Sequence, residues 1–399
     1  MERSPYSAAV NSHPFDAITL AELRQRQSAK WRVYGDDVLP AWVAEMDYPL
    51  AEPITRALHD AISKHDCGYA YPGDLGAGYA AWAKGAYGWV VDGADVKVVP
   101  DVMTGVSELL RVATAPGDAI VIDPPVYSPF ASTVRELGRT LVQVPLATDN
   151  GRPCLDLEGL GRAFAAGARM HLLCSPQNPT GIVHHRASLE ALAKLADQHG
   201  VLVVSDEIHA PLTLSGAAHV PFATVSEAAA RRGITLASAS KAWNLAGLKA
   251  ALVIATSPEA RDVVARLPPE LPYHAGHLGV LAAKAAFRDG ADWLASARAI
   301  LERNRALLGE LLAKELPEVA YRPPEAGYLT WLDCRALKLT RDPSRVFLER
   351  GKVALSPGPT FGPGGQGFAR LNIATSRALL EEAVSRMARA VSEERLTPS

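Results

Sequence analysis

The sequence is poor in cysteine and has no paired cysteine motif. Its 399 residues include four cysteines, which are scattered along the chain at Cys67, Cys154, Cys174 and Cys334. Disulfide frameworks and zinc sites need cysteines at short, repeated spacings, and this chain has none of those spacings. The sequence therefore predicts free thiols of a reducing compartment, a cytoplasmic location and no metal site.

The sequence also lacks an excess of charge of either sign and lacks a long apolar run. Lys and Arg number 41, Asp and Glu number 43, and the formal net charge is −2. Proteins that bind nucleic acid or membrane surfaces usually carry a basic excess. No run of about 18 apolar residues occurs, and residues 1–20 contain no apolar signal-peptide core. We therefore expect neither nucleic acid nor a membrane as a partner.

Short apolar runs are what the sequence has in quantity. Between about residues 95 and 255 they alternate with helical patterns, and they span 119–123, 140–146, 170–174, 201–205, 234–238 and 250–255. Several runs are apolar throughout, as strands buried on both faces are. The helical segment 188–200 ends at Gly200, a typical helix stop. Strand followed by helix, repeated, predicts an α/β domain with a doubly wound, mainly parallel sheet.

The pattern changes after about residue 286. A long helical stretch follows over 287–316, then strands in "EAGYLTWLD" and "ARLNIA", and a last helix near 377–393. This part predicts a smaller α+β C-terminal domain. We expect an N-terminal segment at residues 1–50 that packs against the small domain, a large domain at 51–285 and the small domain at 286–399.

Four polar or aromatic residues follow the predicted strands. They are Tyr127 in "PPVYSPF", Asn178 in "SPQNPTG", Asp206 in "SDEIH" and Lys241 in "SASK". Functional residues of open α/β sheets gather at the carboxyl ends of strands. Structural explanations exist as well: a core aromatic ring, a turn, a capping carboxylate and a lysine that extends its ammonium to water. For Lys241 the alternative is an amine that loses its proton and attacks a carbonyl.

In their order along the chain, these motifs resemble those of the fold-type I enzymes that use pyridoxal 5′-phosphate (PLP), the aspartate-aminotransferase superfamily. The shared pattern is Asn-Pro-x-Gly, an Asp at a strand end, Ser-x-Ser-Lys and a late Arg. Here these residues are Asn178, Asp206, Lys241 and Arg370. The resemblance runs from about residue 15 to about residue 395. It implies that the large domain binds PLP and that the substrate is an amino acid, a small molecule.

The resemblance implies a role for each central residue. Lys241 would bind PLP covalently and would later remove the Cα proton of the substrate. Asp206 would pair with the pyridinium nitrogen, so that the ring can accept the electrons of the carbanion. Asn178 would donate a hydrogen bond to the phenolic oxygen of PLP, and Tyr127 would stack on the ring; both would also contact the substrate. Arg370 would bind the substrate α-carboxylate, which suits a guanidinium group.

The resemblance also implies a set of phosphate-binding residues. Gly105 and Val106 would lie at the start of a helix, where free N–H groups and the helix dipole favour an anion. Ser238 would add a hydroxyl, and Lys249 would add a charge where the family often has arginine. Tyr71, in "GYAYP", resembles the tyrosine that reaches the phosphate from the partner subunit. This implies a homodimer with shared active sites.

Longer stretches resemble one branch of the superfamily, the MalY/PatB-type C–S β-lyases. They include "WVAEMDY", "SDEIHAPL", "SKAWNLAGLKAAL" and "LSPGPTFGPGGQGFARLNIA". His209, which would touch the cofactor, stands where ordinary aminotransferases usually carry tyrosine. Glu45 and Tyr48 depart from the Asp and Phe that are more common in the branch. The resemblance implies cleavage of cystathionine or related cysteine S-conjugates to pyruvate, ammonia and a thiol; an aminotransferase and a PLP-binding regulator remain alternatives.

Two further segments have weaker signals. We interpret His184-His185 as an exposed turn rather than a metal site. The "LPYHAGHLG" segment at 271–279 is a candidate for the side-chain pocket, of this subunit or of its neighbour.

Overall fold

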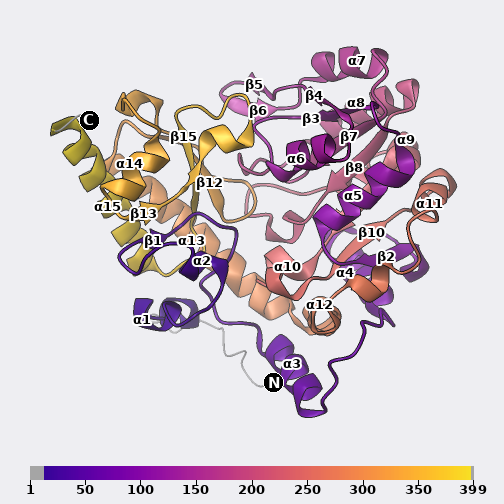
Figure 1. Ribbon diagram of the computed structural model, residues 1–399, viewed down its shortest axis with the longest axis horizontal. Coiled ribbons are helices and arrows are strands. Elements are labelled where there is room, and N and C mark those ends of the chain that lie inside the picture. Colours follow the sequence, from indigo (N-terminus) through magenta and orange to yellow (C-terminus); the bar gives the residue numbers. More distant parts are fainter. Residues whose placement is uncertain (1–12, 397–399) are drawn as a thin grey trace.

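A seven-stranded sheet forms the centre of the protein in the computed structural model, which describes residues 13–396 (Figure 1). In spatial order the strands are β2 (Val96–Val99), β10 (Ala251–Ile254), β9 (Gly233–Ala237), β8 (Leu202–Asp206), β7 (Met170–Cys174), β3 (Ala119–Ile122) and β4 (Thr140–Gln143). The pairs among β9, β8, β7, β3 and β4 are parallel, whereas β10 is antiparallel to both of its neighbours. The predicted mainly parallel sheet is therefore confirmed, with β10 as the reversed strand.

Helices cover both faces of this sheet, which explains why its strands are apolar throughout. On one face Ile120 and Ile122 join the core formed with α5 (Val102–Ala113), α6 (Pro129–Glu136) and α11 (Pro258–Val264). On the other face Val121 packs with α7 (Leu157–Ala165), α8 (Arg186–His199) and α9 (Glu227–Arg232). Helix α8 ends at Gly200, as predicted, and the φ of +68° at Gly200 is one that glycine adopts without strain.

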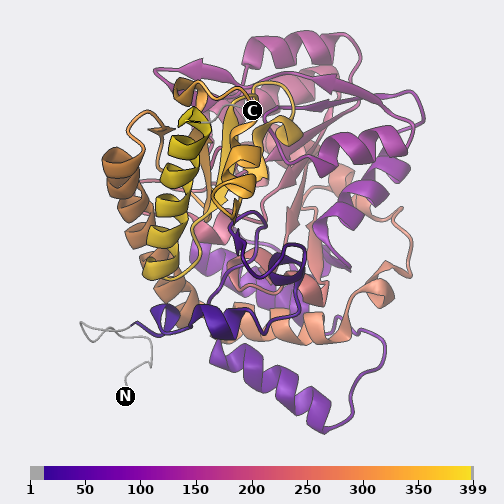
Figure 2. The ribbon, with the colours of Figure 1, turned by 60° about the vertical axis from the view of Figure 1, so that its left-hand side comes forward.

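A second, four-stranded antiparallel sheet lies in the C-terminal part of the chain, drawn in orange and yellow in Figure 1. Its order is β11 (Ala320–Tyr321), β12 (Leu329–Asp333), β15 (Phe368–Asn372) and β14 (Ser356–Pro357). The helices of this part are α13 (Ala291–Glu315), α14 (Pro343–Glu349) and α15 (Arg377–Leu396). Figure 2 shows α15 lying beside α13. The predicted α/β fold with a smaller α+β part is confirmed.

The predicted helical stretch at 287–316 is not continuous. Residues 287–289 end α12 (His277–Asp289), and α13 begins only after Gly290. The N–H of Gly290 still donates to the Ala286 carbonyl, but the Gly290 carbonyl accepts from the Trp243 indole N–H at 2.9 Å. A Cβ at position 290 would lie 2.5 Å from both Ala286 O and Trp243 Nε1. The close approach of Trp243 therefore requires glycine at this break.

The N-terminal segment connects the two sheets. After α1 (Leu20–Leu23) and α2 (Ala29–Arg32), β1 (Leu39–Pro40) pairs in parallel with β13 (Val353–Ala354). The chain then continues into α3 (Glu52–Ser63), which packs on α12, and into α4 (Leu75–Tyr87). Residues 1–12 of the predicted segment lie outside the described residues, and the predicted boundaries at 50 and 285 stay predictions.

The remaining elements are short. They are the hairpin β5 (Ala147–Asp149) and β6 (Arg152–Cys154), the single turn α10 (Ala239–Ala242), and 3-10 helices at Pro14–Asp16, Gly93–Asp95, Ala210–Leu212, Phe222–Thr224, Ala246–Leu248, Leu271–His274, Arg335–Leu337 and Gly358–Phe361. Between residues 13 and 396, no helix has the length and apolarity that crossing a membrane requires.

Candidate active site

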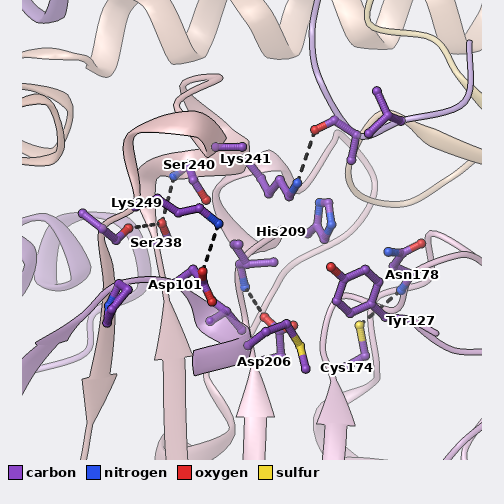
Figure 3. Close-up of a pocket in the computed structure, with 18 of the residues that line it drawn as sticks. Asp101, Tyr127, Cys174, Asn178, Asp206, His209, Ser238, Ser240, Lys241 and Lys249 are labelled. Atoms are coloured by element: carbon purple, nitrogen blue, oxygen red, sulfur yellow. Dashed lines mark hydrogen bonds and ion pairs between the residues drawn. The ribbon is translucent and has the colours of Figure 1, made fainter. Parts of the chain in front are cut away.

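A pocket of about 300 Å³ opens at the carboxyl ends of β7, β8 and β9 (Figure 3). The N-terminal segment contributes Val43 and Ala44 to its wall, and β15 contributes Arg370. Eight of the predicted site residues line it: Tyr127, Asn178, Asp206, His209, Ser238, Lys241, Lys249 and Arg370. The fold therefore brings together residues that are up to about 240 positions apart in the sequence.

Lys241 places a buried amine in this pocket. It lies on α10, directly after β9, and its Nζ donates a hydrogen bond to the Ala44 carbonyl at 3.3 Å. Burial, and then the positive charge of Arg370, lower the pKa of Lys241 to about 8, against the opposing effect of Asp206. A pKa near 8 increases the neutral fraction of the amine at pH 7 by roughly two orders of magnitude. The cramped position of this lysine therefore favours a nucleophile or a base.

Asp206 ends β8 and faces the same space as Lys241 (Figure 3). Burial raises the pKa of Asp206 to about 7, although its Oδ1 accepts a hydrogen bond from the Ile208 N–H at 3.1 Å. A carboxyl group in this state gains from a cationic N–H partner. Burial, followed by the charges of Lys241 and Arg370, lowers the pKa of His209 to about 3, so this imidazole is neutral.

Arg370 places a buried positive charge in the pocket. Its Nη1 donates to Asn178 Oδ1 at 2.9 Å, and its Nη2 donates to the Trp42 carbonyl at 2.9 Å and to Ser356 Oγ at 3.1 Å. Its Nε is buried and has no acceptor among the described residues. Burial lowers the pKa of Arg370 to about 10, which leaves it charged at neutral pH. A fixed guanidinium with an unused buried donor suits a carboxylate ligand.

The first turn of α5 forms one end of the pocket. Asp101 caps this helix by accepting the Thr104 N–H, and Val102 and Met103 line the pocket. Lys249 donates to Asp101 Oδ2 at 3.0 Å, whereas Ser238 Oγ donates to the Ala250 carbonyl and accepts the Ser240 N–H. The first N–H groups of a helix have no partner within the helix. This end of the pocket therefore suits an anion, although Asp101 offsets part of the Lys249 charge.

The prediction that Gly105 and Val106 begin the helix is wrong by three residues, because α5 begins at Val102. The N–H of Gly105 already donates to the Asp101 carbonyl, and Val106 is fully buried in the core. A Cβ at position 105 would lie 3.1 Å from Leu236, so this glycine permits close packing of the helix on β9. Val102 and Met103, which begin the helix, line the pocket instead.

Comparison with known proteins identifies the family. Residues 72–387 match the sequence profile of the aminotransferase class I and II family. The chain belongs to that family. It is 44% identical, over 96% of its length and 99% of the relative, to a Mycobacterium leprae protein provisionally named cystathionine beta-lyase. It is 36% identical to the cystathionine beta-lyase PatB of Bacillus subtilis, with 92% of this chain and 97% of PatB covered.

A solved structure agrees with these sequence relatives. The crystal structure of a provisionally named PLP-dependent beta-cystathionase from Corynebacterium diphtheriae superposes with a TM-score of 0.89 at 37% identity. The match covers 94% of this chain and 98% of that one. The three-dimensional arrangement of both sheets therefore agrees with membership of the aminotransferase class I and II family.

The polar groups of the pocket match those that the cofactor of this family requires. PLP needs an amine for its aldehyde, an acidic partner for its ring nitrogen and N–H donors for its phosphate. Lys241, Asp206 and the first turn of α5 offer these groups at different places in one pocket. The buried carboxyl of Asp206 has no cationic hydrogen-bond partner among the described residues, which a protonated ring nitrogen would supply.

Tyr71 does not lie in this pocket. Its side chain is 74% exposed, and the neighbouring Tyr69 is 86% exposed. A single chain therefore gives Tyr71 no contact with the other site residues. The 271–279 segment likewise contributes no residue to the pocket of its own chain.

Sequence reasoning missed the part played by backbone carbonyls of the N-terminal segment. Trp42 and Ala44 accept hydrogen bonds from Arg370 and Lys241, and Ala44 also accepts from the buried Tyr328 hydroxyl at 3.1 Å. No side-chain motif reveals such contacts, because any residue can supply a carbonyl. The only available signal was the resemblance of "WVAEMDY" to one branch of the family.

The interpretation of His184-His185 as an exposed turn is wrong for His184. This ring is buried, and its Nε2 lies 3.2 Å from the Cys174 carbonyl. Burial lowers the pKa of His184 to about 4. His185 is exposed. Within residues 13–396, no group of three or more His, Cys, Asp or Glu side chains is arranged to hold a metal ion.

Proposed function

We propose that this protein is a PLP-dependent C–S β-lyase that cleaves cystathionine or related cysteine S-conjugates to pyruvate, ammonia and a thiol. The observation that carries the proposal is the buried Lys241 amine, set in one pocket with Asp206 and Arg370. The reaction class is supported by relatives that span more than nine tenths of the chain and bear cystathionine β-lyase names.

Each of the central pocket residues has a separate role in this reaction. Bound PLP supplies an electron sink for the carbanion at the substrate Cα. Arg370 binds and orients the substrate carboxylate, and Asp206 holds the proton of the ring nitrogen. Lys241 Nζ, once released by the substrate amine, takes the Cα proton, because its lowered pKa of about 8 leaves a usable fraction of the amine neutral near physiological pH.

Departure of sulfur completes the chemistry. The Cβ–S bond breaks with its electron pair on sulfur, and a proton must reach the thiolate. Burial, and then the negative charge of Asp206, raise the pKa of Tyr127 to about 12, so its hydroxyl is protonated and available as a donor in the pocket that Lys241 also lines. One water then converts the remaining three-carbon fragment to pyruvate and ammonia, which balances the reaction.

Elimination can be told from transamination by omitting the keto acid. The protein is incubated with L-cystathionine or an S-alkyl-cysteine and no keto acid. We expect many turnovers with pyruvate, ammonia and thiol in equal amounts, because elimination regenerates the cofactor. Pyruvate and thiol are measured over time against the enzyme concentration.

An aminotransferase would give a different result in this assay. It would stop after about one equivalent and resume only on addition of a keto acid. Stalling of this kind with several thioether substrates would contradict the proposed lyase. A protein that binds PLP but turns over neither with nor without a keto acid would instead point to the regulator.

We also propose a homodimer in which Tyr71 of each chain completes the site of the other. Its exposure supports this, because Tyr69, Tyr71 and Tyr273 together leave three large aromatic side chains uncovered. The free cysteines support a cytoplasmic location, since such thiols persist in reducing compartments.

Mixed dimers test the shared site. Tyr71→Phe and Lys241→Ala are each expected to be nearly inactive alone. After mixing and subunit exchange, we expect about a quarter of the wild-type activity, because half of the dimers carry one site without either change. The recovered activity is followed as a function of the mixing ratio.

Two results would contradict the shared site. One is a Tyr71→Phe protein with unimpaired activity. The other is no recovery on mixing when native mass spectrometry shows that mixed dimers have formed. Tyr321→Phe is the matched control, because the Tyr321 hydroxyl donates to the Arg305 carbonyl within its own chain.

A further inference from the structure

Glu207 is a buried carboxylate that the mechanism above does not use. It directly follows Asp206 at the end of β8 and is 3% exposed. Because neighbouring residues of a strand point to opposite faces, Glu207 faces away from the pocket that Asp206 lines. Burying a carboxylate is costly unless donors surround it. A buried Glu207 therefore points to a structural or functional role.

Three donors hold the Glu207 carboxylate. Ser205 Oγ and the Phe222 N–H donate to Oε1 at 2.9 Å each, and His219 Nε2 lies 3.1 Å from Oε2. Donors on both oxygens suit the ionised form of a carboxyl group. His219 Nδ1 is buried and has no partner among the described residues. A charged imidazole would carry a second, buried N–H at Nδ1 with no acceptor. A neutral imidazole that donates from Nε2 avoids this cost, so His219 and Glu207 together carry one negative charge.

The surroundings of Glu207 do not screen this charge. A small cavity beside Glu207 is lined by Tyr79, Trp82, Tyr87 and Phe287, and Ser238 lines both this cavity and the active-site pocket. The titratable groups around Glu207 are His219, Tyr79 and Tyr87 on one side and Asp206 on the other, and Arg298 acts on Tyr87. Burial, followed by the negative charge of Glu207, raises the pKa of Tyr79. Arg298 is the positive group among them, and it forms no ion pair with Glu207, whose ion-pair contact is His219.

Asp206 lies within the field of Glu207. Lys241, Tyr127 and Cys174 are the other titratable groups that interact with Asp206. After burial, the charge of Glu207 is among the effects that raise the pKa of Asp206. A negative charge favours the protonated state of any neighbouring acid–base unit. In the loaded enzyme that unit is Asp206 together with the ring nitrogen, which share one proton.

We propose that Glu207, held by His219, is a positioning residue that strengthens the hold of Asp206 on the proton of the cofactor ring nitrogen. The inference rests on the proposed function, because it concerns bound PLP. The proton keeps the ring an effective electron sink. Glu207 acts through Asp206 and touches neither cofactor nor substrate.

The ring nitrogen itself provides the test. Apo-protein is loaded with PLP labelled with ¹⁵N in the ring, and the nitrogen chemical shift is followed against pH. In Glu207→Gln, whose amide oxygen can still accept from Ser205 and Phe222, the midpoint of deprotonation is expected to fall by about one pH unit. A unit charge about 10 Å away at an effective dielectric near 20 has an effect of this size.

A matched control separates this effect from a loss of stability. Asp123 and His171 form a second buried carboxylate–histidine pair on the same sheet, with 2.6 Å between Oδ2 and Nε2. Asp123 is not among the groups that shift Asp206. Asp123→Asn should therefore lower the melting temperature but leave the ¹⁵N midpoint within about 0.2 units of wild type.

The possible results of this experiment distinguish a role for Glu207 from its absence. If Glu207→Gln does not fold, the double variant Glu207→Met/His219→Leu replaces the pair by apolar groups, which buried pairs often tolerate, and the same fall of about one unit is expected. An unchanged midpoint in either folded, PLP-loaded variant overturns the inference. A wild-type protein that does not bind PLP would instead contradict the proposed function.

Discussion

Replacing Lys241 with alanine is expected to remove the absorbance of covalently bound PLP and to lower turnover by about 10³-fold to 10⁴-fold. The amine has two tasks, because it binds the cofactor aldehyde and later takes the Cα proton. Its pKa of about 8, lowered first by burial and then by Arg370, suits both tasks near neutral pH. Alanine leaves no group that can reach the same position. The measurements are the visible spectrum of the purified protein and the steady-state rate with L-cystathionine.

Lys249→Ala is the control for this experiment. Lys249 lies in the same pocket but pairs with Asp101 at 3.0 Å, at the end proposed for the phosphate. This variant should keep the absorbance of the covalent cofactor while binding PLP more weakly. A folded Lys241→Ala protein with full activity would exclude the amine from the reaction. Loss of the absorbance in Lys249→Ala but not in Lys241→Ala would show that Lys249, and not Lys241, binds the cofactor covalently.

The sequence predicts the centre of this site well because motif order and strand context agree. Asp206 and Lys241 each follow an apolar run, and both runs became neighbouring strands, β8 and β9. Parallel strands bring their carboxyl ends to one edge, so adjacency in the sheet places the two side chains together. Arg370 was placed by its motif alone, and β15 of the second sheet carries it into the same pocket.

The phosphate end of the site shows where sequence reasoning fails. The resemblance places Gly105 and Val106 at the start of a helix, where free N–H groups would bind the phosphate. The actual reason for Gly105 is packing, since a side chain there would meet Leu236 at 3.1 Å. Asp101 was the better signal, because an Asp before an apolar helical pattern is a typical N-cap. A glycine alone does not distinguish a turn from a close helix–strand contact.

Local patterns also cannot predict which polar groups tertiary contacts will bury. A His-His pair after a turn predicts side chains exposed to solvent. His184 is nevertheless buried and hydrogen-bonded to the Cys174 carbonyl. The contact of Lys241 with Ala44 joins residues 197 positions apart and involves only a backbone oxygen on one side. Such contacts depend on how the N-terminal segment crosses between the two sheets, which no periodicity encodes.

Arg370→Lys is expected to lower kcat/KM by about 10²-fold to 10³-fold, mostly through KM. The guanidinium is fixed by Asn178, by the Trp42 carbonyl and by Ser356, and the Phe361 ring lies 4.9 Å from its Cζ. Lysine keeps a charge but cannot make these contacts and bind both carboxylate oxygens at once. Removing one partner of a buried charged pair costs about 2–5 kcal/mol, or roughly 30-fold to 4,000-fold, and the expected loss lies within that range.

Arg335→Lys is the matched control. Arg335 lies over the Phe368 ring at 4.9 Å, and the rings of Phe368 and Phe361 both pack against Trp331. Arg335 is bonded to Asp333 at the surface and does not line the pocket. This substitution should change kcat/KM less than about threefold. A thioether amine that lacks the α-carboxylate extends the test. Wild type should discriminate strongly against it, and Arg370→Lys should lose most of that discrimination, because the variant cannot bind both carboxylate oxygens even when the substrate has them. Equal discrimination by both proteins would show that Arg370 does not bind the carboxylate.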